Sequence, residues 1–163
     1  MRRLLAPLLV AAALSGCAAM KPPQPGWTET QTLAHWGPPT SRYALADGLT
    51  RLEYATGPFG RTTWMIDVAA DGRVVAAKQV LTEENLMAVQ GRLPGMSRDE
   101  LLRTLGRPGE RRGGGWQGGE VWSWRYATNE CWWFQSSIGD DGIVRDGVFS
   151  PDPRCDHPSD PRD

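Results

Sequence analysis

Cysteine and histidine are the residues of this sequence best suited to catalysis, redox chemistry or metal binding, and there are few of them. The chain has three cysteines and two histidines, His35 and His157. A catalytic histidine needs a nucleophile and an orienting acid, and no Gly-X-Ser-X-Gly, His-Glu-X-X-His or phosphate-loop motif occurs. The sequence therefore predicts a non-catalytic protein without a metal or cofactor, with an uncharacterised enzyme as the least favoured alternative.

The N-terminus has the pattern of an export signal. Arg2 and Arg3 precede an apolar run, Leu4 to Leu14, which is too short to span a bilayer of ~30 Å. The run leads into Leu14-Ser15-Gly16-Cys17, with small residues directly before a cysteine, and it resembles the lipobox of bacterial lipoproteins. The resemblance implies cleavage before Cys17 and acylation of that residue. An ordinary signal peptide with a chance cysteine is the alternative.

Acylation at Cys17 would decide where the protein resides. Two or more acyl chains hold a protein stably on a membrane. Ala18 follows Cys17 where an Asp would be expected for inner-membrane retention, so resemblance to Gram-negative sorting rules implies the outer membrane, facing the periplasm. Met20 to Gly26 is rich in proline and predicts an extended tether. Removal of residues 1–16 leaves 16 basic against 19 acidic residues, a net charge of −3 that does not favour nucleic acid.

Cys131 and Cys155 are the only cysteines after the lipidation candidate. Behind an export signal the compartment is oxidising, so an even pair predicts a structural disulfide that ties the C-terminal tail to the chain before it. A loop of about 25 residues would stabilise the fold by roughly 3.5 kcal/mol in the chain-entropy model. Two free thiols or a redox pair are the alternatives, and no Cys-X-X-Cys spacing supports the latter.

The sequence contains an internal repeat. Residues 26–39 align with residues 95–108 at a constant shift of 69, with Gly, an apolar residue, Thr or Ser and a later Gly-X-Pro in register. Tyr54-Ala55-Thr56 aligns with Tyr126-Ala127-Thr128 at a shift of 72, and Asp71-Gly72 with Asp141-Gly142 at a shift of 70. Two units of about 65 residues are therefore expected.

Helix signals lie at equivalent places in the two halves. Thr28 with Gln31 and Ser97 with Glu100 form capping boxes that predict helices over 29–36 and 98–105. Gly37 and Gly106 then stand where a left-handed residue ends a helix. A third helix is predicted to begin after Thr82 and to end at Gly91.

Strand signals follow each capped helix. Gly and Pro make up 32 of 163 residues, which suits short strands joined by turns. The alternation of apolar residues predicts three strands in each half, with Asp-Gly hairpin turns before the last of them. The predicted strands are 49–54, 63–69, 74–80, 121–127, 131–137 and 143–149. A flexible loop is expected from Arg111 to Gly119, and a mostly uncovered tail from Ser150 onward.

These residues carry a family resemblance. The segments concerned are Thr82 to Leu86, Gly95 to Ser97, Leu101, Leu105 to Pro108 and Trp124 to Tyr126. Together they resemble the SmpA/OmlA (BamE) family of outer-membrane assembly lipoproteins, well over 81–149 and more faintly over 26–80. The resemblance implies two helices on one face of a three-stranded antiparallel sheet. A tandem pair of such units, as expected here, also looks like the fold of secreted β-lactamase inhibitor proteins.

Aromatic residues give two candidate roles to the second half. Trp122, Trp124 and Tyr126 share one face of a predicted strand and belong either to the core or to a partner-binding face, with the core favoured. Trp132 and Trp133 are adjacent and must point to opposite faces. We expect whichever of them faces away from the helices to be a candidate for exposed recognition.

The Gly-rich loop adds three further candidate partner contacts, Arg111, Arg112 and Trp116. A solvated loop is the alternative interpretation for the two arginines.

The expected architecture is α+β. It comprises a signal peptide (1–16), a lipidated cysteine with its tether (17–26), two repeats of short helices packed on a three-stranded antiparallel sheet (27–80 and 81–150) and a polar tail (151–163). The first functional hypothesis is an accessory protein-interaction module in outer-membrane protein assembly, through the β-barrel assembly machinery, or in envelope maintenance. The alternative is an inhibitor-like periplasmic binder that occupies an enzyme's cleft. A continuous, aromatic-lined sheet across both units would favour the inhibitor, and a patch confined to one unit would favour the accessory module.

Overall fold

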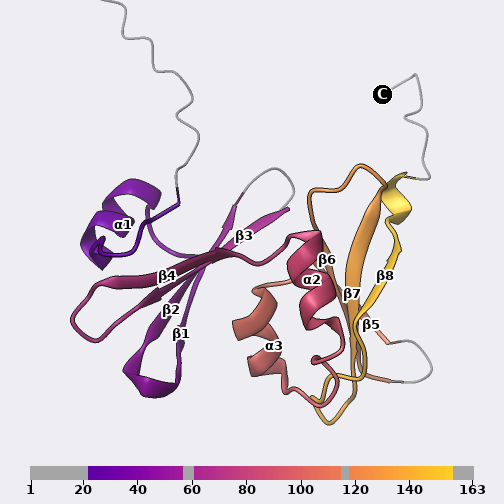
Figure 1. The fold of residues 1–163 in the computed structure, drawn as a ribbon. Coiled ribbons are helices and arrows are strands. Elements are labelled where there is room, and N and C mark those ends of the chain that lie inside the picture. The colour runs from indigo at the N-terminus through magenta and orange to yellow at the C-terminus, as the bar shows by residue number, and fades with distance from the viewer. Residues whose placement is uncertain (1–21, 57–60, 115–117, 156–163) are drawn as a thin grey trace, which may run out of the picture.

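The structure, a computed structural model, describes residues 22–56, 61–114 and 118–155. The signal peptide, Cys17 and Trp116 lie outside these ranges. Figure 1 shows an α+β fold with two four-stranded antiparallel sheets, in the orders β1-β2-β3-β4 and β5-β6-β7-β8. None of the helices in the described ranges has the length and apolar character needed to cross a membrane.

The helices are short and the strands pair in chain order. The helices are α1 (Glu29–Trp36), α2 (Glu83–Gln90) and α3 (Arg98–Leu105). The first sheet contains β1 (Ser41–Ala44), β2 (Thr50–Thr56), β3 (Thr62–Val68) and β4 (Val74–Gln79). The second contains β5 (Glu110–Gly113), β6 (Glu120–Arg125), β7 (Trp132–Ile138) and β8 (Val148–Pro151).

The predicted helix boundaries are confirmed. Both capping boxes form, with the hydroxyl oxygens of Thr28 and Ser97 accepting from backbone N–H groups at 3.1 and 3.3 Å. Gly37 and Gly106 follow these helices with φ of 76° and 79°, the left-handed region that favours glycine. Local signals were sufficient here because each cap is made within four residues of chain.

The prediction of three-stranded sheets was wrong, since each sheet has a fourth strand. The missed strands are the edge strands β1 and β5. Each has four residues and no run of alternating apolar side chains, so each is held by backbone bonds to its neighbour. The loop predicted from Arg111 to Gly119 therefore begins as strand. The strand predicted over 143–149 is also displaced, because 143 and 144 make isolated bridges and β8 starts at Val148.

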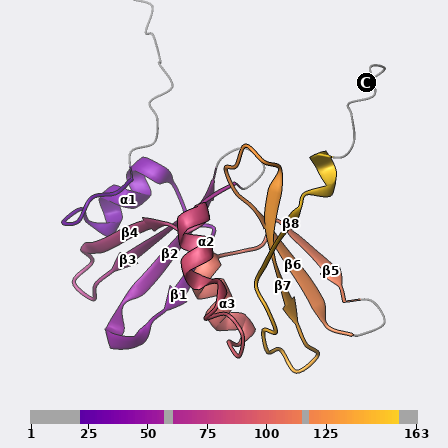
Figure 2. The same cartoon turned by 45° about the vertical axis from the view of Figure 1, so that its right-hand side comes forward.

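The elements stack in layers, with α2 and α3 between the two sheets (Figure 2). One face of the first sheet packs on the N-terminal segment and α1 through Leu52, Ile66 and Val74. Its other face contributes Met65 and Val80 to the larger core, where α2 and α3 meet Trp122, Trp124, Phe134 and other side chains of the second sheet. The second sheet thus has helices on one face only.

Polar contacts fix the first sheet to the chain around α3. The buried carboxylate of Glu53 accepts from the Tyr43 hydroxyl at 2.5 Å and from the Arg107 N–H at 2.8 Å. Arg51 donates to the Arg103 carbonyl at 2.7 Å. Burial of Tyr43 and its bond to Glu53 raise the pKa of that phenol to about 12. The hydrogen bonds to Arg103 and from Arg107 therefore attach the first sheet to α3 and to the turn after it.

The same backbone hydrogen bonds occur twice, 69 or 70 residues apart. Gly26 N–H donates to Val74 and Gly95 N–H to Val144, each at 2.9 Å. At the aromatic residues, however, the alignment of the two halves differs from the predicted one. Tyr54 donates to the Gly37 carbonyl as Trp124 donates to the Gly106 carbonyl, each at 3.0 Å. Tyr54 therefore corresponds to Trp124 at a shift of 70, and the alignment of Tyr54 with Tyr126 was wrong.

Both ends of the described chain are held to the fold. Pro23 is buried and residues 26–28 bond to the start of β4, so the described part of the predicted tether packs on the first sheet. At the other end, Asp152 is buried and its N–H donates to the Cys131 carbonyl at 2.8 Å. The mostly uncovered tail predicted from Ser150 is therefore confirmed as far as residue 155, with Asp152 as the one buried residue of 150–155.

Candidate interaction site

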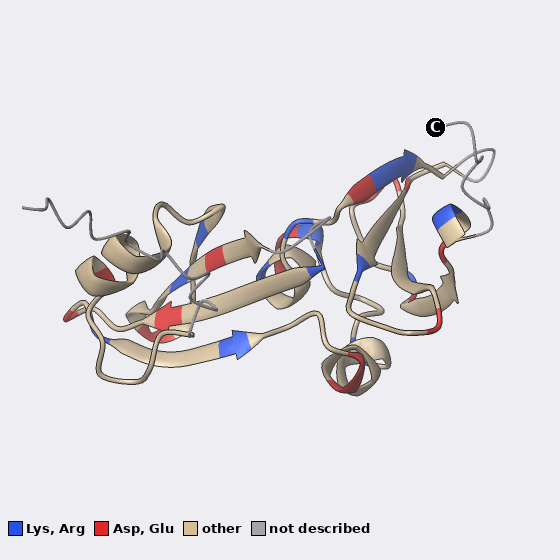
Figure 3. Cartoon of the chain, turned by 90° about the horizontal axis from the view of Figure 1, so that it is seen from above, with Lys and Arg blue, Asp and Glu red and all other residues tan. Residues whose placement is uncertain are grey.

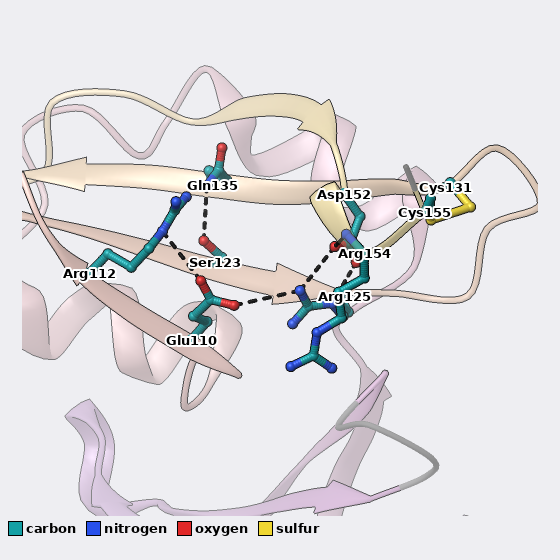
Figure 4. Close-up of polar contacts among 9 residues, drawn as sticks. All are labelled: Glu110, Arg112, Ser123, Arg125, Cys131, Gln135, Asp152, Arg154 and Cys155. Carbon is teal, nitrogen blue, oxygen red and sulfur yellow. Dashed lines mark hydrogen bonds and ion pairs between the residues drawn. A yellow bond between two sulfur atoms is a disulfide. The ribbon is translucent and has the colours of Figure 1, made fainter. Parts of the chain in front are cut away.

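In the described part of the chain, the second sheet has one face that no α-helix covers, and we call this the outer face. Side chains alternate along a strand, so Trp122 and Trp124 enter the core while Ser123 and Arg125 point the other way. The register places eight further side chains on the outer face with them. The residues are Glu110, Arg112, Val121, Ser123, Arg125, Trp133, Gln135, Ser137, Val148 and Ser150. Figure 4 shows the polar contacts among several of them, and Figure 3 shows the acidic and basic residues of the edge strand β5.

A buried ion pair lies at one end of the outer face, where β6 and β8 end. Arg125 donates to the two carboxylate oxygens of Asp152 at 2.5 and 2.9 Å, and both side chains are less than a tenth exposed. Glu110 lies 3.5 Å from Arg125 and 3.3 Å from Arg112, so it joins the two arginines. A bidentate arginine–carboxylate pair holds both groups in one geometry.

The electrostatics of this pair favour the charged forms. Burial opposes ionisation of Asp152, but hydrogen bonds from Arg125 and from the Arg154 N–H outweigh it and lower its pKa. The bond to Asp152 in turn raises the pKa of Arg125 against the effect of burial. Breaking the pair would leave a buried charge without a partner, which is strongly destabilising.

Trp133 faces away from the helices, as one of the adjacent tryptophans must, but it is not exposed. Only 2% of the residue is accessible, because Arg125 and Arg112 lie over it at 4.9 and 5.3 Å from the ring. Its indole Nε1 is buried without a hydrogen-bond partner in the described structure. The expectation that the outward-facing tryptophan would be an exposed anchor was therefore wrong, and of the two guanidinium groups above it only that of Arg112 is exposed.

The other candidate contacts are separated. Arg112 is on the outer face with its side chain 53% exposed, and Val148 on the same face is 41% exposed. Arg111 lies on the helix side, 4.1 Å from the ring of Trp122. Trp132 is also on that side, partly buried against the core. Of the sequence candidates within the described ranges, which exclude Trp116, the structure brings together Trp133 and Arg112.

Sequence reasoning missed the residues that organise this site. The alternation Trp122-Ser123-Trp124-Arg125 did carry a signal, because it places Arg125 on the face opposite the aromatic stripe. No local pattern indicated that Asp152, 27 residues later, would be its partner.

The disulfide explains how Asp152 reaches Arg125. Cys131 and Cys155 are joined, with their Cα atoms 6.0 Å apart and a sequence separation of 24. The bond fixes the turn that contains Asp152 against the start of β7, as Figure 4 shows. In this way the disulfide positions half of the buried ion pair.

Side chains that could bind a metal ion or take part in catalysis are few in the described ranges. They contain no cluster of three His, Cys, Asp or Glu side chains that could hold a metal ion. His35 packs edge-on against Trp27, with the ring centroids 5.5 Å apart.

Comparison of the chain with protein-family models, curated proteins and solved structures gives no match.

Proposed function

We propose that this chain is an outer-membrane lipoprotein, acylated at Cys17, that acts as a non-catalytic protein-interaction module in outer-membrane protein assembly or envelope maintenance. In this proposal its halves are tandem copies of one helix-plus-sheet unit of the SmpA/OmlA type. The lipobox-like sequence supports the anchor. The hydrogen bonds repeated at 69 to 70 residues support the duplication.

The observation that carries the interaction role is the outer face of the second sheet. No α-helix of the described ranges covers it, and one end of it is held by the Arg125–Asp152 pair and the nearby disulfide. Arg112 on the edge strand β5 and Val148 on the opposite edge strand β8 give it an exposed charge and an exposed apolar side chain. A preorganised face of this kind orders few side chains on binding, which reduces the entropic cost of association.

The inhibitor-like alternative has less support. It calls for one concave sheet, lined by aromatic residues, that runs across both halves. The two sheets are separate, and most of their aromatic side chains lie in the two cores. The candidate face is confined to the second sheet, which is the arrangement expected of the accessory module.

In-cell photocrosslinking tests the interaction role. A photoreactive amino acid at position 112 or 148 should crosslink the acylated protein to a defined envelope protein. The same probe at position 42, on the exposed edge strand β1 of the first sheet, is the matched control. Equal crosslinking from position 42, or none from the outer face, would contradict the proposal.

Fractionation tests the anchor separately. Cys17→Ser should abolish acylation and move the protein out of the membrane fraction, because the acyl chains supply the stable attachment. If this variant still sediments wholly with outer membranes, the lipobox interpretation is wrong.

A further inference from the structure

A cleft of about 260 Å³ lies between the first sheet and the helices α2 and α3, away from the outer face. Its sheet side includes Met65 on β3 and Lys78 on β4, which are directly paired across the two strands. Its helix side includes Val89 on α2 and Arg92 just after it. The cleft is therefore built by both layers of the molecule.

The charges in this cleft do not balance. Arg51 and Asp67 neutralise one another, with two hydrogen bonds at 2.6 and 2.8 Å. Lys78 and Arg92 are exposed and form no ion pair with any residue of the described ranges. No other acidic residue lines the cleft. Two uncompensated positive charges thus share one concave site in a chain with a formal net charge of −1.

The wall below these cations is apolar. Met65, Val80 and Val89 line the cleft and are almost fully buried, so they offer a firm hydrophobic surface of limited area. Ligand sites commonly combine such walls with a few convergent polar groups. The volume suits a small ligand, since sites for drug-sized molecules begin at about 300 Å³.

We propose that this cleft binds a small organic anion, a carboxylate or phosphate carrying a short apolar group. The anionic group lies between Lys78 and Arg92, and the apolar group lies against Met65, Val80 and Val89. The anion is either a free molecule or the C-terminal carboxylate of a polypeptide. The site is independent of the proposed outer-face interaction.

Lysine labelling tests this site, because Lys78 and Lys21 are the only lysines of the chain. The acylated protein in zwitterionic vesicles is treated with an amine-reactive reagent, and each lysine is followed by mass spectrometry. Millimolar hexanoate or hexyl phosphate should slow labelling of Lys78 at least fivefold and leave Lys21 unchanged. Hexanol, the uncharged probe, should protect neither. Equal slowing of both lysines, or protection by hexanol, would overturn the proposal.

Two variants complete the test. Arg92→Gln should raise the hexanoate concentration needed for half-protection of Lys78 at least tenfold. Arg107→Gln, another exposed arginine without an ion pair in the described ranges, is the matched control and should leave it unchanged. An unaltered midpoint in Arg92→Gln would refute the site. If hexanoate protects Lys78, the same labelling is repeated with a short peptide that has a free C-terminal leucine and with its amidated form. Protection by the free peptide alone identifies a polypeptide C-terminus as the source of the anion, and protection by neither identifies a free molecule.

Discussion

The first sheet is covered on both faces, by α1 on one side and by α2 and α3 on the other, whereas the second sheet has helices on one side only. Yet the two sheets share their strand order, their capped helices and the hydrogen bonds of their turns. The two halves therefore have equivalent local structure in different surroundings. Features common to both halves depend on the local sequence, and features that differ depend on the tertiary contacts of each sheet.

The environments are stabilised in different ways. The face of the first sheet towards α1 buries apolar side chains, which the hydrophobic effect favours without further partners. The outer face of the second sheet instead buries a bidentate ion pair and a tryptophan beneath arginines, beside a disulfide. A polar face of this kind is stable only while every partner is present. We therefore expect the second sheet to be the more sensitive to single polar substitutions.

The largest effect is expected from Gly106→Val, with Gly37→Val as its matched partner. Both glycines have positive φ, but a Cβ at Gly106 would lie 2.8 Å from Thr63 Cγ2, while at Gly37 nothing lies within 4 Å. We expect a loss of about 4 kcal/mol at Gly106, from backbone strain plus overpacking, and of about 1 to 2 kcal/mol at Gly37 from strain alone. Denaturant unfolding measures both, and equal losses would mean that α3 does not pack tightly on the first sheet.

Removal of the disulfide should have the next largest effect. The double variant Cys131→Ser, Cys155→Ser should lower the free energy of unfolding by about 3.5 kcal/mol. Mass analysis of the untreated protein should first find both thiols oxidised. Complete alkylation of the two cysteines without reduction would contradict the disulfide itself.

The ion pair of the outer face gives a smaller, pH-dependent effect. Asp152→Asn should cost about 3 kcal/mol at pH 7, because the buried Arg125 loses its bidentate partner and keeps only the longer contact with Glu110. Asp67→Asn, in the more exposed pair with Arg51 of the first sheet, should cost about 1 kcal/mol.

The sign of the pH effect follows from the lowered pKa of Asp152. Its stabilising contribution is fully present above the ordinary pKa of about 3.9 and is lost as the pH falls through the folded-state value. Unfolding curves of wild type and Asp152→Asn should therefore converge in acid. A constant difference down to pH 2 would contradict the role given to this carboxylate.

The smallest effects concern the caps, which the two halves share. Ser97→Ala and Thr28→Ala should each cost about 1 kcal/mol, or roughly 2–4 °C in melting temperature for a chain of this size. Similar losses would support a duplicated unit. A loss at Ser97 with none at Thr28 would mean that the first half depends on other contacts.

The sequence predicted the helices and turns well because their determinants are local. The capping boxes at Thr28 and Ser97, the glycines at 37 and 106 and the Asp-Gly turns each act over a few residues. The five predicted strands other than the last were placed within two residues, since alternation is also readable along the chain. Apolar alternation likewise directed Trp122 and Trp124 into the core.

The tertiary structure alone decided the edge strands and the candidate site. β1 and β5 are strands because their backbones form hydrogen bonds with the neighbouring strands β2 and β6. The side-chain pattern of these segments does not predict that pairing. Trp133 is covered because Arg112 reaches it from the edge strand β5, two strands away, and because Asp152 is brought to Arg125 across 27 residues. Burial and ion pairing of this kind depend on which segments meet in space, which one sequence read locally does not specify.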